Sequence, residues 1–133
     1  MKQDRVIPQG TDIDIDAEWV WNYFRDVDSL NPQRVTQHYQ QDGTFRFANH
    51  PPVQGLKEIE TLLTNFYRQI QSMEHINTGL WLGNNSAVFE AEVIFVRHDG
   101  AKVEIPAISI IRRQEALIKS FMFVMDASPL QNN

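Results

Sequence analysis

Two ionisable residues in the apolar second half of the chain, His75 and Asp126, could carry proton-transfer chemistry. Imidazole titrates close to neutral pH, which suits a general acid or base. Asp126 ends the last apolar run, where a carboxylate could act as a base or hold the imidazole of His75. A buried polar group without a partner costs about 1–3 kcal/mol, so one kept among apolar residues is a candidate for function. We therefore predict that His75 and Asp126 are the catalytic pair.

Each member of this pair also has a structural explanation. His75 could be a core histidine that is hydrogen-bonded to a carbonyl or to a neighbouring side chain. Asp126 could simply cap the turn into Ala127-Ser128-Pro129, because aspartate before a Ser-Pro sequence is ordinary turn chemistry. The sequence leaves both explanations open.

Five further residues are candidate contacts for a bound small molecule. Alternation along one strand places Asn77 and Trp81 on the face that carries the histidine, and Phe89 faces inward on the next strand. Tyr23 belongs to an aromatic stripe on a helix, from which a phenol could donate to a ligand oxygen, although such aromatics are more often core residues. Asn49 precedes a rigid Pro-Pro loop that could hold it at the rim of a cavity.

The elements that must position these residues follow from periodicity. Helical spacing of apolar residues predicts helices over 16–27 and 56–70, and an Asn-Pro start predicts a short helix over 32–39. Alternation predicts a strand over 44–48 and further strands over 73–82, 86–97, 102–113 and 116–126. Because turn residues separate the last four strands, we expect an antiparallel meander.

Two of these strands are apolar on both faces, over 105–111 and 117–125. One face can pack against the helices, but the other needs a separate cover. We therefore expect a homodimer that forms through the sheet.

Composition excludes several classes of function. A net charge of −5 without a basic cluster argues against a nucleic-acid partner. No apolar run is long enough to span a membrane and no signal peptide is evident, so we expect a cytoplasmic protein. The chain has no cysteine, and its four histidines are widely spread, so no metal site is expected. Its 133 residues suit a single domain over 1–133, with loose ends at 1–13 and 131–133.

Three segments, FRFANHPPVQGLKEIETLLTNFY, MEHINTG and VRHDGAKVEIPA, carry a resemblance that extends over nearly the whole chain. With the predicted order of elements, they resemble the SnoaL-like branch of the nuclear transport factor 2 (NTF2-like) superfamily. The resemblance implies an α+β, cystatin-like fold: a cone-shaped barrel in which three N-terminal helices pack on a curved, mostly antiparallel sheet. It also implies a deep pocket, no cofactor and, for many members, a dimer through the sheet.

The same resemblance bears on the candidate residues. Ketosteroid isomerases of this superfamily carry a base carboxylate near the end of the first strand, where this chain has Asn49 and no acid. Polyketide cyclases are similar to this chain in having a proposed base aspartate on the closing strand, where Asp126 lies. Scytalone dehydratase is similar in having a pocket histidine on the strand after the third helix, as His75 is here.

Together these observations predict a small-molecule pocket protein without a cofactor. Its chemistry would be acid–base catalysis of the isomerase, cyclase or dehydratase kind, on a small carbonyl-bearing or polycyclic substrate. The alternative is a non-catalytic module of the same fold that binds a ligand or associates with another protein, because one fold can host many functions.

Overall fold

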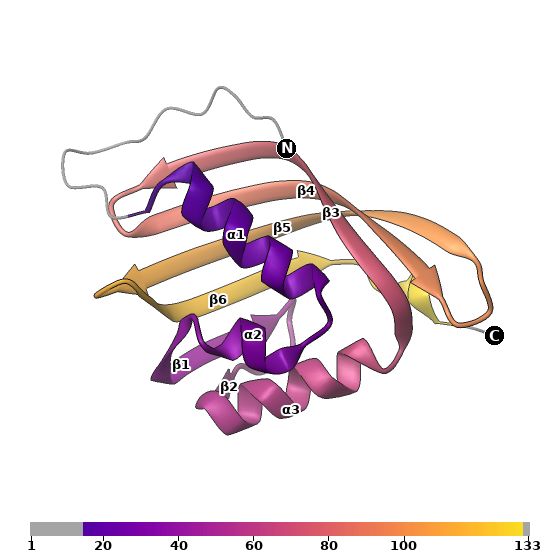
Figure 1. Cartoon of the computed structure of the whole chain (residues 1–133), viewed down its shortest axis with the longest axis horizontal. Helices are drawn as coiled ribbons and strands as arrows, with labels where there is room; N and C mark the ends of the chain where they lie inside the picture. The colour runs from indigo at the N-terminus through magenta and orange to yellow at the C-terminus, as the bar shows by residue number, and fades with distance from the viewer. Residues whose placement is uncertain (1–14, 132–133) are drawn as a thin grey trace.

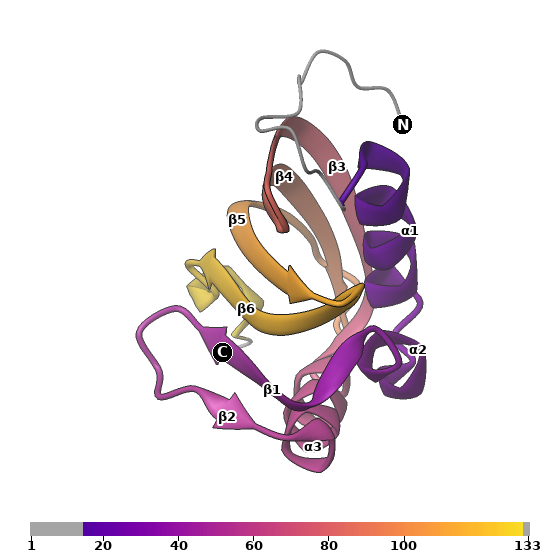
Figure 2. The same cartoon turned by 90° about the vertical axis from the view of Figure 1, so that its left-hand side faces the viewer.

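The computed structural model of the protein describes residues 15–131, and its core is a curved sheet with helices on one side (Figures 1 and 2). The sheet has six strands in the order β2-β1-β6-β5-β4-β3. The strands are β1 (Tyr39–Phe47), β2 (Val53–Gln54), β3 (Ile70–Gly83), β4 (Ser86–Arg97), β5 (Lys102–Gln114) and β6 (Leu117–Met125). The helices are α1 (Ala17–Asp28), α2 (Pro32–Thr36), α3 (Leu56–Tyr67) and a C-terminal 3-10 turn, η1 (Ser128–Leu130).

The helices begin where the sequence supplies capping groups. Asp16 accepts a hydrogen bond from the backbone N–H of Trp19 at 2.8 Å and so caps α1. Asn31 caps α2 in the same way through the N–H of Gln33 at 3.0 Å, and Pro32 follows it at the first helical position. The helix starts predicted from the sequence are therefore confirmed.

The N-terminal part of the chain contains less helix than the sequence predicts. Only α1 and α3 are long, with 12 residues each, whereas α2 has five residues and ends at Thr36. The chain then enters β1 at Tyr39, five residues before the strand predicted over 44–48. The expectation of three full N-terminal helices is corrected accordingly, because Tyr39 already pairs with Ile118 of β6.

Strands β3 to β6 form the predicted antiparallel meander. The first strand, β1, lies parallel to the last, β6, so the sheet is mixed. This parallel pair joins the two halves of the chain and brings β1 and β2 beside α3, at the lower end of the molecule in Figure 2. The result is a curved α+β structure whose concave side holds the helices.

A bulge in β3 changes which residues face the helices. Asn77 pairs with Ala91 and Gly79 pairs with Glu90, so β3 has one extra residue at this point. Beyond the bulge the alternation is reversed, and Trp81 faces away from the helices with 55% of its surface exposed. Its indole lies over Gly79, where an added Cβ would come within 2.6 Å of the ring.

The sheet therefore has two distinct faces. The inner face packs against the helices and carries the buried alternate residues, such as Val93 and Phe95 on β4. The outer face bears no helix of the described residues and exposes Ile76, Trp81 and Val124. We use the terms inner face and outer face in this sense throughout.

Most of the chain ends predicted to be loose, at 1–13 and 131–133, lie outside the described residues. Gln131 lies within them, and its N–H donates to the carbonyl of Ser128 at 3.1 Å. None of the helices in residues 15–131 is both long and apolar enough to cross a membrane.

Candidate active site

A cavity of about 570 Å³ lies between the helices and the inner face of the sheet. Eight aromatic rings contribute to its wall, two each from α1, α3, β1 and β6. The residues with polar side chains that line it include His75, Tyr23 and Tyr67. A mostly apolar wall with a few polar groups is typical of a small-molecule site.

His75 is held by a carboxylate from another element, Asp28 at the end of α1. The imidazole Nδ1 lies 2.7 Å from Asp28 Oδ1, and the backbone N–H of His75 donates to Oδ2 at 2.8 Å. The His75 side chain is only 3% exposed. Its other nitrogen, Nε2, is buried and has no hydrogen-bond partner within residues 15–131. An oriented imidazole with one nitrogen unpaired in a cavity is suited to exchange a proton with a ligand.

Aromatic rings fix the plane of this imidazole. The ring centroids of Phe24, Phe89 and Phe123 lie 4.8, 5.9 and 6.4 Å from that of His75. Packing against these rings leaves the imidazole few alternative orientations. The site therefore combines an oriented imidazole with apolar surroundings.

Sequence reasoning missed Asp28, although the sequence contains a signal for it. Asp26 and Asp28 both lie in the last turn of α1, where the helix dipole is negative and disfavours carboxylates. Two acids at such a position are expected only where each has a compensating partner. Here Asp28 binds His75, and Asp26 binds Arg34 and His38.

Three tyrosines extend the polar part of the cavity. The hydroxyls of Tyr23 and Tyr39 lie 2.6 Å apart, and the hydroxyl of Tyr67 donates to the carbonyl of Val27 at 2.9 Å. Burial raises the pKa of all three phenols above the usual value, so they stay protonated at neutral pH. Tyr23 lies in the cavity wall as predicted, whereas Tyr39 lies behind it.

The predicted pairing of His75 with Asp126 is wrong. Residues of β6 that face the cavity alternate through Phe121 and Phe123, so Asp126 emerges on the other side of the sheet and is exposed. Its Oδ1 accepts from the N–H of Ser128 at 3.1 Å, and hydrogen bonds from Ser128 lower the pKa of this carboxyl. Asp126 therefore caps the turn into η1, which was the structural alternative.

Four predicted binding residues also lie away from the cavity wall. Trp81 is on the outer face because of the bulge, and Asn49 is exposed on its loop. Asn77 stabilises the bulge, since its Nδ2 donates to the carbonyls of Gly79 and Glu90 at 2.8 and 3.0 Å. Its Oδ1 accepts from the indole N–H of Trp21 at 3.2 Å.

The fourth, Phe89, is 1% exposed and lies in the core rather than at the surface of the cavity. Its ring stacks on that of Phe24, with centroids 3.9 Å apart. Phe89 therefore supports the wall from behind.

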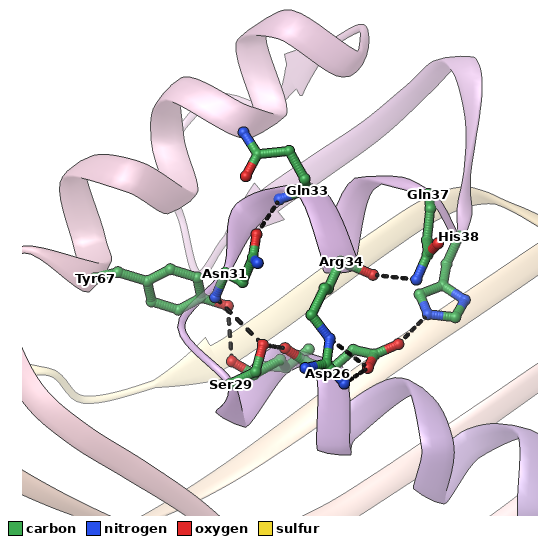
Figure 3. A network of polar contacts seen from close by, with 9 residues as sticks. Asp26, Ser29, Asn31, Gln33, Arg34, Gln37, His38 and Tyr67 are labelled. Atoms are coloured by element: carbon green, nitrogen blue, oxygen red, sulfur yellow. Dashed lines mark hydrogen bonds and ion pairs between the residues drawn. The ribbon is translucent and has the colours of Figure 1, made fainter.

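A second polar network lies at the junction of α1, α2 and β1, and Figure 3 shows it. Asp26 accepts from Arg34 Nη2 at 2.9 Å and lies 2.7 Å from His38 Nε2. Burial of Asp26 opposes its ionisation, but the hydrogen bonds from His38 and Arg34 outweigh this effect and lower its pKa. The imidazole of His38 also packs edge-on against Tyr23, so the network supports the cavity wall from outside.

The lowered pKa of Asp26 predicts a pH-dependent loss of stability. We expect Asp26→Asn to reduce the free energy of unfolding at pH 7, and this difference from wild type to shrink as the pH falls. Because the folded-state pKa is below the unfolded value of about 3.9, the stabilisation is complete above that value and is lost as the pH falls through the folded pKa. Urea unfolding at pH 7, 5 and 3 measures it, with the exposed Asp42→Asn as control. A difference that stays constant with pH would contradict the assignment.

The β4–β5 hairpin holds one end of the cavity in place. Arg97 Nη1 donates to the carbonyl of Pro129 at 3.1 Å, and Arg97 also pairs with Asp99. The hydrogen bonds from Arg97 lower the pKa of Asp99 to about 2. Leu130, the last residue of η1, lies in the cavity wall. The β4–β5 hairpin and η1 are therefore in direct contact.

We predict that Arg97→Gln loosens η1. The backbone N–H groups of Leu130 and Gln131 donate to carbonyls within this turn, at 2.9 and 3.1 Å, and should exchange with deuterium faster in the variant. Hydrogen–deuterium exchange measured by NMR tests this. Arg112→Gln, at an exposed position on the next strand, should leave both amides unchanged. Equal exchange in both variants and in wild type would show that Arg97 does not secure the turn.

The grouping of ionisable side chains gives no metal centre in the described part of the chain. Within residues 15–131 no three His, Asp or Glu side chains are clustered as metal ligands would be.

Solved structures share this architecture at low sequence identity. A SnoaL-like polyketide cyclase from Jannaschia has a TM-score of 0.78 and 12% identity, covering 97% of this chain and 94% of its own. A protein with a ketosteroid isomerase-like fold from Catenulispora acidiphila, in complex with trimethylamine, has a TM-score of 0.73 and 16% identity, covering 82% and 85%. TerC, co-crystallised with polyporic acid, has a TM-score of 0.73 and 8% identity, covering 84% and 92%. The fold of the protein is thus NTF2-like.

The sequence narrows this class to one family. The model of the SnoaL-like domain family matches residues 20–121, most of the chain, and the protein belongs to that family. A comparison with curated protein sequences gave no match. The expected SnoaL-like, NTF2-like identity is confirmed.

Proposed function

We propose that this protein is a cofactor-free acid–base enzyme in which Nε2 of His75 exchanges a proton with a small organic molecule. The substrate class is a carbonyl-bearing or polycyclic compound, and the reaction is of the isomerase, cyclase or dehydratase kind. One observation carries the proposal. Nε2 is buried at an aromatic cavity without a partner in residues 15–131, while Nδ1 is fixed by Asp28.

The geometry supports a definite division of roles. When Asp28 accepts the Nδ1 hydrogen, Nε2 of the neutral imidazole carries a lone pair that can take a proton from a carbon next to a carbonyl group. The electrons of that C–H bond then form the enolate, and the charge of Asp28 stabilises the imidazolium. Return of the proton to a different atom completes an isomerisation.

Tyr23 is proposed to bind the oxygen on which negative charge develops. The hydroxyls of Tyr23 and Tyr39 form one hydrogen bond with each other, and this bond uses the hydrogen of only one of them. The hydrogen of the other hydroxyl is free to bond elsewhere. Tyr39 lies behind the cavity wall, and the arrangement that uses every hydrogen has Tyr39 donating to Tyr23 and Tyr23 donating to the ligand. A hydrogen bond that forms as the charge develops would favour the enolate.

The structural neighbours support a ligand-binding role. Two of them hold small organic molecules, trimethylamine and polyporic acid, and others are described as polyketide cyclases or as an epoxide hydrolase. A non-catalytic binding module of the same fold is the alternative. We test the two with 2-tetralone, an uncharged bicyclic ketone, by following exchange of its α-hydrogens in D₂O by NMR. Accelerated exchange supports the enzyme, whereas binding without exchange supports the module.

A cytoplasmic homodimer through the outer face is part of the same proposal. Ile76, Trp81 and Val124 expose 41, 55 and 43% of their surface there, which is unusual for large apolar residues on one sheet face. We expect sedimentation equilibrium at micromolar concentration to give twice the 15.5 kDa chain mass. Trp81→Glu should give the single mass, whereas Thr64→Glu on α3 should not. A monomeric wild-type protein would contradict the dimer.

A further inference from the structure

We propose that the cavity selects its ligand by charge and admits an uncharged ring system, while it rejects carboxylates, sulfonates and ammonium compounds. This inference rests on the proposed function, because it concerns the same cavity and defines the substrate class more closely. It comes from the charges that surround the cavity and from the groups that already neutralise them.

The wall offers no permanent cation to an acidic ligand. Within residues 15–131 no lysine or arginine lines the cavity, and the carboxylate of Glu58 lies at its mouth. The carboxylate of Asp28 lies directly behind the imidazole of His75. A buried anion without a paired cation loses several kcal/mol of hydration that the protein does not replace.

The backbone adds to this effect. The C-terminal end of α1 carries the negative end of the helix dipole, and it adjoins the cavity through Val27. The carbonyl of Val27 accepts the hydroxyl of Tyr67 in the cavity wall. The charge of Asp28 also helps to raise the pKa of Tyr67, after burial, so its field extends to this wall. A second negative charge from a ligand would be repelled.

A cationic ligand would be attracted by the aromatic faces, but among residues 15–131 it finds no free carboxylate in the interior. Both oxygens of Asp28 are already hydrogen-bonded, one to Nδ1 and one to the backbone N–H of His75. Glu58 is exposed to solvent at the mouth of the cavity. Its attraction for an ammonium group is therefore weak and does not offset the hydration that this group loses on binding. The interior therefore provides aromatic surface, one proton acceptor and one hydroxyl donor, which match a neutral ring system with an oxygen substituent.

Three probes with the same naphthalene ring system test the inference at pH 7. Isothermal titration calorimetry with wild-type protein compares 2-naphthol, which is uncharged, with 2-naphthoate and with 2-naphthyltrimethylammonium. We expect 2-naphthol to bind about 100-fold more tightly than 2-naphthoate and about tenfold more tightly than the ammonium compound. Naphthoate binding within threefold of naphthol, or tighter binding of the cation, would overturn the proposal. Failure of all three to bind at millimolar concentration would overturn it as well.

A charge added to the wall provides the matched control. Thr61 lines the mouth of the cavity on α3, whereas Thr64, one turn further along, does not line it. Thr61→Arg should tighten 2-naphthoate binding about tenfold relative to 2-naphthol binding, and Thr64→Arg should leave the ratio of the two affinities as in wild type. The test is independent of proton transfer. If the charge ranking holds but 2-tetralone exchange is absent, the enzyme proposal fails while this inference stands.

Discussion

His75→Gln is expected to slow the exchange of 2-tetralone α-hydrogens by roughly 100- to 10,000-fold, the usual contribution of a positioned general base. Glutamine has a similar length and hydrogen-bonding capacity, but its amide does not accept a proton at neutral pH. His98→Gln is the matched control, because His98 lies on the β4–β5 hairpin and contacts the carbonyl of Arg68 rather than the cavity. NMR in D₂O measures all three proteins under the same conditions.

Asp28→Asn should have an effect of the same order without removing the imidazole. The backbone N–H of His75 can only donate, so the single oxygen of asparagine must face it. The amide NH₂ group then faces Nδ1, which must accept, and the ring hydrogen moves to Nε2. The lone pair that faces the cavity is lost, although the contacts keep nearly the same geometry.

The two variants together separate catalysis from binding. Affinity for 2-tetralone should change little in either, while the exchange rate falls in both. Exchange at the wild-type rate in a folded His75→Gln protein would refute the proposed role of the imidazole. Circular dichroism confirms folding, so a loss of activity cannot be confused with a loss of structure.

Phe89→Ala is expected to lower the free energy of unfolding by about 3–5 kcal/mol, the largest effect on stability that we predict. Phe89 is 1% exposed and stacks on Phe24, and it also contacts the ring of His75. Its removal leaves a void in the layer behind the cavity, because the inner face of β4 is held on both sides by neighbouring strands.

Phe47→Ala is the matched control for this prediction. Phe47 is half-buried, lines the cavity and already borders empty space, so its loss should cost clearly less. Urea unfolding of both variants at pH 7 measures the difference. A loss below about 1 kcal/mol for Phe89→Ala would mean that this ring is not part of a close-packed core.

The sequence was sufficient to predict the elements that depend on local periodicity. The apolar stripe of α3 and the alternation of β4 each recur over several turns or residue pairs, so a single irregular residue does not obscure them. The turn between β5 and β6, near Gln114, is predicted for the same reason. The helix starts follow from Asp16 and Asn31, whose side chains form caps in the structure.

Some predictions fail because a single extra residue in a strand reverses the face on which all later residues of that strand lie. The bulge between Asn77 and Gly79 reverses the alternation of β3, so a correct placement of His75 led to a wrong placement of Trp81. Strict alternation along β6 puts Asp126 on the same side of the sheet as Val124, as in the structure, but it does not reveal which side is the inner face. That choice is made by the helices, which lie far away in the sequence.

The partner of His75 could not be found from neighbouring residues. Asp28 is 47 positions away and reaches the imidazole only because α1 crosses β3. The parallel pairing of β1 with β6 is of the same kind, since no local pattern indicates it. Both features result from tertiary packing. The sequence carries a signal for the first of them alone, which is the unfavourable position of Asp26 and Asp28 at the C-terminal end of α1.

The parallel pairing of β1 with β6 has a consequence for how the chain folds during its synthesis. β1 emerges from the ribosome early, yet the strand that covers its long edge, from Leu117 to Met125, is made more than 60 residues later. Until then the apolar side chains of Phe45 and Phe47 lack the β6 rings that they contact in the folded protein. Closing such a long loop is slow relative to local contacts. The nascent chain therefore cannot complete the wall of its cavity until its last strand has been made.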